Sequence, residues 1–137
     1  MSNAQSYGLP RDASESARLQ ASHRVFVDNM GFLLHPDIIE DLNKRPRSET
    51  ISIADVATGT GSWPIEAAQK LLLTSKPQFT GFDISDDQLA TAKRLAPSNV
   101  QFQLLDILDP IPQDLVGKFD VRLYPHSLFP SHMESLI

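Results

Sequence analysis

The sequence predicts an α/β protein built on an incomplete parallel sheet. From residue 50 onward, short runs rich in β-branched and aromatic residues alternate with stretches that have helical spacing of apolar residues. A turn with two glycines follows the first run, and an acidic residue closes each of the first three. Because strands that alternate with helices pair in parallel, we expect about four parallel strands with flanking helices, preceded by an N-terminal helical segment.

The expected elements follow from local patterns. Strands are predicted over residues 51–56, 78–84, 100–105 and 119–123. A helix with Pro64 in its first turn should run past Leu71 and Leu72 and stop before Pro77, and another should span residues 85–95. Ahead of the sheet we expect an amphipathic helix from about Ala13 to Gly31 and a short helix over residues 36–42.

Length and composition favour one domain without a membrane span. The 137 residues are 41% hydrophobic and 21% charged, and no apolar run approaches the roughly 20 residues needed to cross a bilayer. The net charge of -5 is dispersed and no basic run follows the pattern of a nucleic-acid-binding segment, so nucleic acid and membrane partners are not expected. The absence of cysteine excludes disulfides and thiolate metal sites, and the expected location is cytoplasmic.

Three acidic residues and the glycine turn define a candidate ligand site. Asp55 ends the first predicted strand ahead of Gly59 and Gly61, Asp83 ends the second, and Asp106 ends the third. In a parallel sheet these strand ends share one edge, where α/β proteins bind ligands. A carboxylate about 20 residues beyond the glycines can accept both hydrogen bonds of a ribose diol. A tight turn without a ligand and a dinucleotide site of NAD type are the alternatives.

These residues resemble a known family. The run DVATGTG, from Asp55 to Gly61, is similar to the Asp-x-Gly-x-Gly-x-Gly loop of class I, Rossmann-like, S-adenosylmethionine-dependent methyltransferases. Ala57 replaces the first glycine, and the loop is expected to keep its shape if Ala57 has a negative φ. Asp106 and the acidic start of the loop favour this family over an NAD-type oxidoreductase fragment.

The resemblance implies a set of cofactor contacts. It places Asp83 on the ribose hydroxyls, Ile84 against the adenine ring, Asp106 near the adenine amino group and Ile107 beside it. The loop contributes three further cofactor-binding positions in addition to Asp55, namely Ala57, Gly59 and Gly61.

Residues ahead of the glycine loop narrow the resemblance towards methyltransferases of fungal secondary metabolism. They are Arg18-Leu19, His23 and the stretch from Gly31 to Pro36. The resemblance implies that the N-terminal helix covers the cofactor, with Tyr7, Arg18 or His23 near the methionine carboxylate or the methyl group. Trp63 has two interpretations, a wall of the cofactor pocket or a buried aromatic at a helix start.

The chain also departs from the family pattern. Phe119-Asp120 resembles the opening of the family's fourth motif, but the strand after it is compressed. We expect a helical cap at residues 1–48 and a binding domain at 49–137 that is truncated on its C-terminal side, without the reversed-strand edge of the sheet. An apolar side of the sheet would then stay uncovered, which a protein partner or a second copy would shield.

Two functions follow as hypotheses. The first is methyl transfer from S-adenosylmethionine to a small molecule, and the second is a non-catalytic subunit that binds the cofactor and acts with a partner protein. No general base or other catalytic residue is identified. The four histidines lack a metal-ligand spacing, so no metal is expected, and Ser62 and Ser127 lack the surroundings of a hydrolase nucleophile.

Overall fold

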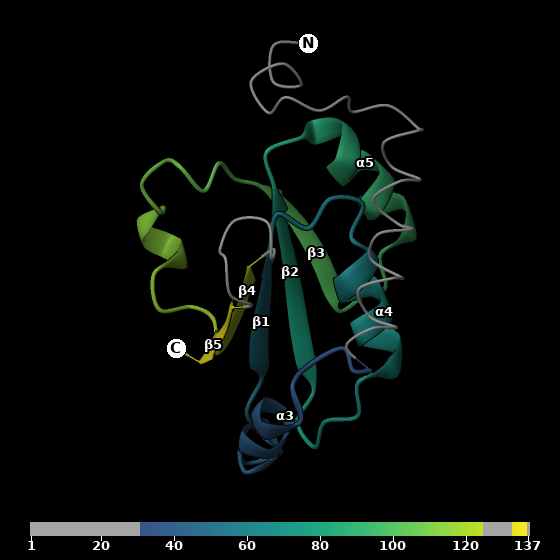
Figure 1. Ribbon diagram of the computed structural model, residues 1–137, viewed down its shortest axis with the longest axis vertical. Helices are drawn as coiled ribbons and strands as arrows, with labels where there is room; N and C mark the ends of the chain where they lie inside the picture. The colour runs from purple at the N-terminus through teal and green to yellow at the C-terminus, as the bar shows by residue number, and fades with distance from the viewer. Residues whose placement is uncertain (1–30, 125–132, 137) are drawn as a thin grey trace.

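The computed structural model describes residues 31–124 and 133–136, which form a five-stranded sheet of order β3-β2-β1-β4-β5 with α4 and α5 packed beside it (Figure 1). The sheet is parallel from β3 to β4, as the alternation of strand and helix patterns predicts. The α/β class with four parallel strands is therefore confirmed. The bounds of these strands are β1 (Ile51–Val56), β2 (Pro77–Asp83), β3 (Val100–Leu104) and β4 (Val121–Tyr124).

The fifth strand was not expected. β5 (Met133–Leu136) pairs antiparallel with β4 and forms one edge of the sheet. A four-residue segment that contains a glutamate and a serine has no alternating apolar pattern, so its pairing with β4 decides its conformation. The prediction that the sheet lacks a reversed strand at this edge is wrong for this position.

One face of the sheet carries the main core. In strands, alternate residues point to opposite faces, and on this face the strands present buried apolar side chains to the helices. α4 (Ser62–Lys70) contributes Ala67, and α5 (Asp86–Leu95) contributes Leu89 and Ala92. The sheet residues in this core are Ile51, Ile53, Phe79, Val100, Phe102, Val121 and Leu123.

The opposite face has a smaller core and a polar border. Ala54 and Phe82 are covered there by Leu115, from the short 3-10 helix η1 (Gln113–Leu115), and by Phe119, whose ring meets Phe82 edge to face at 5.7 Å. By the same alternation, Gln101 and Gln103 of β3 and Arg122 of β4 lie on this side and are exposed. The expected uncovered apolar side is therefore not found on this face of the described strands, because Leu115 and Phe119 cover its apolar residues and the exposed ones are polar.

Helix α3 (Pro36–Asn43) confirms the short helix predicted at residues 36–42. Pro36 occupies the first turn, and the Nδ1 atom of the N-cap residue His35 accepts a hydrogen bond from the Asp37 amide at 3.1 Å. Leu34 and Leu42 are fully buried in the main core. Two residues of the expected cap, Leu34 and Leu42, therefore belong to the same core as the sheet.

The helices that flank the sheet begin as predicted, but one ends early. Ser85 caps α5, and its hydroxyl accepts a hydrogen bond from the Gln88 amide at 3.3 Å. α4 ends at Lys70 because Leu71 already has extended backbone. Leu71 and Leu73 then pack against the core while Leu72 is 88% exposed, so these leucines do not extend the helix. The helix expected from Ala13 to Gly31 falls, except for Gly31 itself, outside the described residues.

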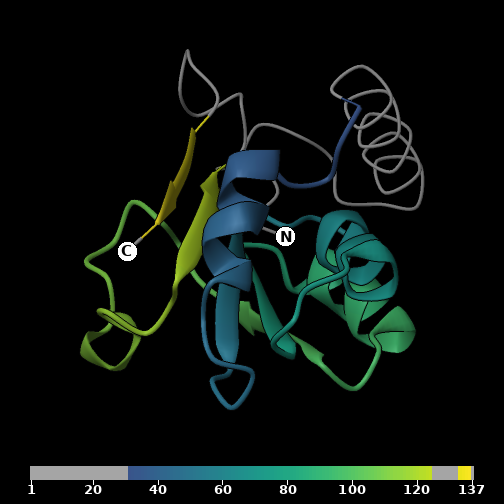
Figure 2. The same cartoon turned by 90° about the horizontal axis from the view of Figure 1, so that it is seen from below.

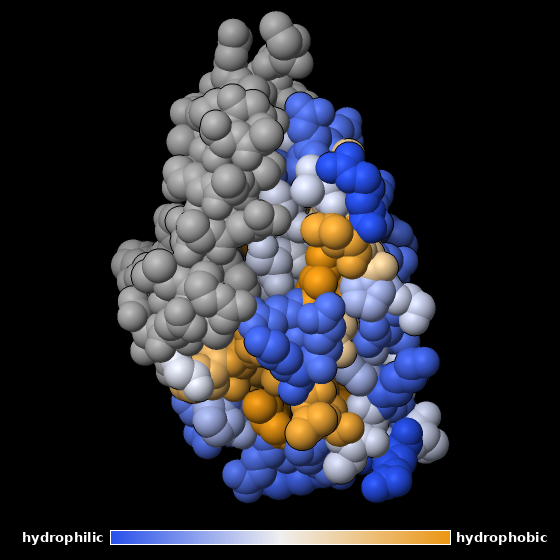
Figure 3. All heavy atoms as spheres, turned by 90° about the vertical axis from the view of Figure 1, so that its right-hand side faces the viewer, coloured by the Kyte–Doolittle hydropathy of each residue, from blue (hydrophilic) through white to orange (hydrophobic). Residues whose placement is uncertain are grey.

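The views of the molecule place the elements relative to the two ends of the sheet. α3 lies near the amino ends of β1 and β2, and the β1–α4 and β2–α5 connections lie at the opposite end (Figures 1 and 2). On the side that carries α4 and α5, groups of apolar side chains show between polar ones (Figure 3). In the part of the chain that the structure describes, no helix has the length and apolar character needed to cross a membrane.

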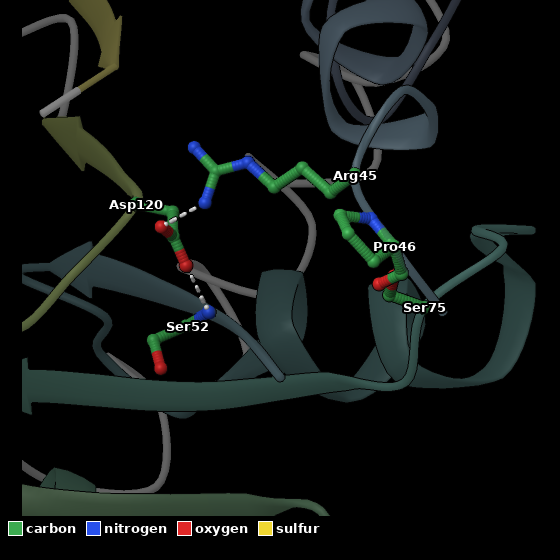
Figure 4. A network of polar contacts seen from close by, with 5 residues as sticks. All are labelled: Arg45, Pro46, Ser52, Ser75 and Asp120. Atoms are coloured by element: carbon green, nitrogen blue, oxygen red, sulfur yellow. Dashed lines mark hydrogen bonds and ion pairs between the residues drawn. The ribbon is translucent and has the colours of Figure 1, made fainter. Parts of the chain in front are cut away.

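The link between α3 and β1 is hydrogen-bonded to the segments that lead into β4 and β2, the two strands beside β1. Arg45 donates a hydrogen bond to Oδ1 of Asp120, and Oδ2 of Asp120 accepts one from the Ser52 amide at 2.8 Å (Figure 4). On the β2 side, the hydroxyl of Ser75 donates to the carbonyl of Pro46 at 2.9 Å. These contacts hold the amino end of the sheet, away from the candidate site.

Candidate cofactor site

The candidate site lies where the parallel strands β1, β2 and β3 end. The β1–α4 loop, the end of β2 and the turn after β3 meet at this edge, because parallel neighbours end together. Two backbone hydrogen bonds connect them. The Thr58 amide donates to the Phe82 carbonyl at 2.7 Å, and the Leu105 amide donates to the Asp83 carbonyl at 2.9 Å.

The glycine loop has three residues in the left-handed region. Gly59 has a φ of 62° and Gly61 a φ of 76°, which glycine adopts without a side-chain clash. Ala57 has a φ of 60°, so the condition of a negative φ at this position is not met. The loop keeps its turn with a strained alanine, a conformation that costs an L-residue roughly 1–2 kcal/mol.

Asp55 is held below the loop with a raised pKa. Its Oδ2 accepts a hydrogen bond from the hydroxyl of Thr58 at 2.8 Å. Burial of the carboxyl raises the pKa of Asp55 to about 7, the hydrogen bond from Thr58 opposes that rise, and the nearby carboxylate of Asp83 adds to it. Asp55 is therefore a group that changes charge near neutral pH.

Asp83 joins three segments of the site. Its Oδ2 accepts a hydrogen bond from the Gly59 amide at 2.8 Å, and its Oδ1 accepts one from the Ser85 amide at 2.9 Å. The residue is only 8% exposed, and its carbonyl accepts a hydrogen bond from the amide of Leu105. The sequence indicates the acid at this position, but it does not show that its carboxylate also holds the glycine loop against the start of α5.

The remaining predicted contacts lie beside Asp83. Ile84 follows it and is half-buried. Asp106 and Ile107 stand in a turn just beyond β3, which ends at Leu104 rather than at the acid. Oδ1 of Asp106 accepts a hydrogen bond from the Leu108 amide at 2.9 Å, which stabilises that turn. All the predicted contact residues therefore belong to the three segments that meet at this edge.

Sequence reasoning missed two residues of the site. Thr58 bonds Asp55 and lies 9% exposed within the loop, and Phe102 of β3 packs beneath Gly61 and Gly81. A threonine three residues after a strand-end aspartate is a signal that could have indicated the first contact. Phe102 gave no such signal, because it looks like any other apolar strand residue.

Several other candidates have structural roles or cannot be placed. Nε1 of Trp63 donates to the carbonyl of Leu33 at 2.8 Å, and its ring meets Phe79 edge to face, which favours the buried-aromatic interpretation. Tyr7, Arg18 and His23 lie outside the described residues, as do His126, Ser127 and His132. Within residues 31–124 and 133–136, no cluster of three or more histidine, aspartate or glutamate side chains could hold a metal ion.

A family model described as "Methyltransferase domain" matches residues 47–132, which include the whole of this edge. This chain belongs to the methyltransferase domain family. The match covers the glycine loop, Asp83 and Asp106.

Curated relatives carry related names. Methyltransferase grgD of Penicillium sp is 34% identical over 121 residues, a match that covers 84% of this chain and 39% of the relative. N-methyltransferase verN of Clonostachys rogersoniana is 27% identical over 131 residues, with 96% of this chain and 42% of the relative covered. This chain therefore spans about two-fifths of the length of these relatives.

A solved structure supports the fold. The CMeT domain of the citrinin polyketide synthase superposes with a TM-score of 0.50 at 24% identity, over 63% of this chain and 24% of that chain. At this identity the likeness concerns the fold alone.

Proposed function

We propose that this chain binds S-adenosylmethionine at the carboxyl edge of β1, β2 and β3 and serves methyl transfer to a small molecule. The observation that carries the proposal is the arrangement around Asp83, whose carboxylate fastens the glycine loop at the strand end. Membership of the methyltransferase domain family supports it, and so does the name of the relative grgD. A fungal secondary metabolite is the acceptor class that we propose.

The acidic and apolar residues of the site suit such a cofactor. A carboxylate at the end of the second strand can accept hydrogen bonds from ribose hydroxyls, and we propose Asp83 for that role. Ile84 follows β2 and Ile107 lies in the turn after β3, and we propose that these apolar side chains contact the adenine ring. Asp106 is the proposed acceptor for the adenine amino group, and the loop residues Ala57, Gly59 and Gly61 are proposed to line the methionine portion.

Charge supports the same assignment. When bound, S-adenosylmethionine supplies an electrophilic methyl group on a positively charged sulfonium, next to a positively charged amino group. Asp55, in the Asp55–Thr58 pair, lies close enough to Asp83 for the two carboxyl groups to repel each other. A cationic ligand beside them would favour the ionised form of Asp55. The reaction needs chiefly alignment of donor and acceptor, which explains why no general base stands out.

The proposal extends to the setting of the protein. We propose a cytoplasmic location, an N-terminal helical segment at residues 1–48 ahead of a binding domain at 49–137, and no nucleic-acid partner. We also propose a partner protein or a second copy against the sheet, which on that side would meet the exposed polar residues Gln101, Gln103 and Arg122.

Calorimetry on the 137-residue chain tests cofactor binding. We expect S-adenosylhomocysteine and S-adenosylmethionine to bind more tightly than NAD. Asp83→Ala should weaken the binding by about 1–3 kcal/mol, the usual effect of losing a charged hydrogen-bond partner. The same change also removes the acceptor of the Gly59 and Ser85 amides. The thermal unfolding of the variant is therefore measured as well, to show that it remains folded. Tighter binding of NAD would overturn the proposal.

A further inference from the structure

We propose that Phe102 is a positioning residue for the cofactor: its ring supports the glycine loop from the β3 side and fixes where the loop presents its backbone. The inference rests on the proposed function. Phe102 is not among the proposed cofactor contacts, so its effect acts through Gly61 and Gly81.

The ring fills the space beside two glycines from different segments. A methyl group added at Gly61, in the loop, would lie 2.5 Å from Cζ and 2.8 Å from Cε1 of Phe102. A methyl group added at Gly81, in β2, would lie 2.6 Å from Cδ1 and 2.7 Å from Cε1 of the same ring. Such separations are far below van der Waals contact, so both positions require glycine as long as Phe102 is present.

Phe102 is itself held in place on the sheet. It pairs in register with Gly81, and its side chain is 9% exposed within the main core. Packing in a core restricts an aromatic ring with only two χ angles to few orientations. The ring is therefore a fixed support on β3 for a loop that belongs to β1.

The ring adds to the hydrogen bonds that hold the loop, which include the one from the Gly59 amide to Asp83. Above the ring, the Thr58 amide bonds the Phe82 carbonyl and the Gly61 amide bonds the Thr58 carbonyl at 3.0 Å. Strain at Ala57 works against this turn. Without the ring, the loop can sink towards β3, and a binding site that must first be ordered binds its ligand less tightly.

The test compares Phe102→Val with Phe79→Val. Phe79 lies on the same face of the sheet, is 1% exposed and contacts Trp63 rather than the two glycines, so it controls for the loss of core packing. We expect Phe102→Val to weaken S-adenosylhomocysteine binding by about tenfold, measured by calorimetry, while Phe79→Val changes it little despite a similar loss of thermal stability. Phe102→Leu is the milder variant if valine prevents folding. Equal effects of the two valine substitutions on affinity would overturn the inference.

A double variant that enlarges residue 81 and shrinks residue 102 tests whether the two residues act through one contact, which a general loss of stability would not show. Gly81→Ala alone should also weaken binding, because its methyl group displaces the ring or the hydroxyl of Thr58, 2.8 Å away. In the double variant with Phe102→Val, the added methyl group enters the vacated space, so the two losses should not multiply. If the affinity losses of the two single variants multiply in the double variant, Gly81 and Phe102 do not act through a shared contact.

Amide exchange separates this inference from the proposed function. In the cofactor-free chain, the Thr58 and Gly61 amides should exchange faster in Phe102→Val than in Phe79→Val. A wild-type chain that does not bind S-adenosylhomocysteine would overturn the proposed function and the cofactor role of Phe102 together. A wild-type chain that binds, with unchanged loop exchange and affinity in Phe102→Val, would overturn the inference alone.

Discussion

Ala57 has a left-handed backbone conformation that its Cβ atom disfavours. Its φ of 60° is a glycine conformation occupied by an alanine. We expect Ala57→Gly to raise the free energy of unfolding by about 1 kcal/mol, because relief of the left-handed strain exceeds the greater entropy that glycine gives the unfolded chain. Urea denaturation measures the change.

A helical alanine provides the control. Ala90 is exposed within α5, and glycine there should lower the free energy of unfolding by about 1 kcal/mol. If both substitutions destabilise the protein to the same extent, the strain assigned to Ala57 is absent.

Asp55 makes stability depend on pH. Because its pKa rises from 3.8 to about 7 on folding, the folded protein binds this proton more tightly than the unfolded chain does. The contribution is fully present below about pH 4 and is lost as the pH rises through 7. Asp55→Asn, which keeps an acceptor for Thr58, should therefore be more stable than the wild type at pH 8, with a gap that narrows towards pH 5.

Denaturation curves recorded between pH 4 and pH 8 check this dependence. Thr58→Val is the matched variant, since it removes the hydrogen bond that lowers the pKa of Asp55 but leaves the carboxyl in place. Its stability should still fall over the same range. A constant difference between Asp55→Asn and the wild type at every pH would show that the carboxyl titrates as it does in the unfolded chain.

At the scale of elements, the contact of Arg45 with Asp120 joins the α3–β1 link to β4. Asp120 also receives the Ser52 amide, so Asp120→Ala leaves a β1 donor without this acceptor and should cost about 1–3 kcal/mol of stability. Arg45→Ala removes only an ion pair whose side chains are 32% and 22% exposed, and should cost less than about 1 kcal/mol.

Thermal or urea unfolding of both variants measures these costs. Lys44→Ala is the control, because it removes an exposed pair with Asp41 and should be nearly neutral. Because Asp120→Ala removes both contacts, equal losses for Arg45→Ala and Asp120→Ala would mean that the ion pair, rather than the bond to β1, accounts for the contribution of Asp120.

The elements also show where local patterns suffice. The starts of α3 and α5 were predictable because Pro36 and Ser85 act through the first turn of the helix that follows them. The end of α4 was not, because Leu71 and Leu73 leave the helix to pack against the core. β5 likewise depends on a partner strand that local sequence does not reveal.

At the scale of the whole molecule, the strand order predicts an uneven resistance to local opening. β1 lies between β2 and β4, whereas β3 forms an edge and carries the exposed residues Gln101 and Gln103. We expect the amides of β1 to exchange with deuterium most slowly and those of β3 faster, as measured by NMR. Equal protection of the two strands would indicate that the described sheet opens only as one unit.

The sequence by itself determined the α/β class, the four parallel strands and the edge that carries Asp55, Asp83 and Asp106, because periodicity, glycine and strand-end acids act within a few residues. Only the tertiary structure decided the positive φ of Ala57, the bonds from Asp83 to Gly59 and Ser85, and the place of the Phe102 ring. Each of these depends on which segments pack together across the sheet. Contacts between residues far apart in the chain leave no pattern in the local sequence.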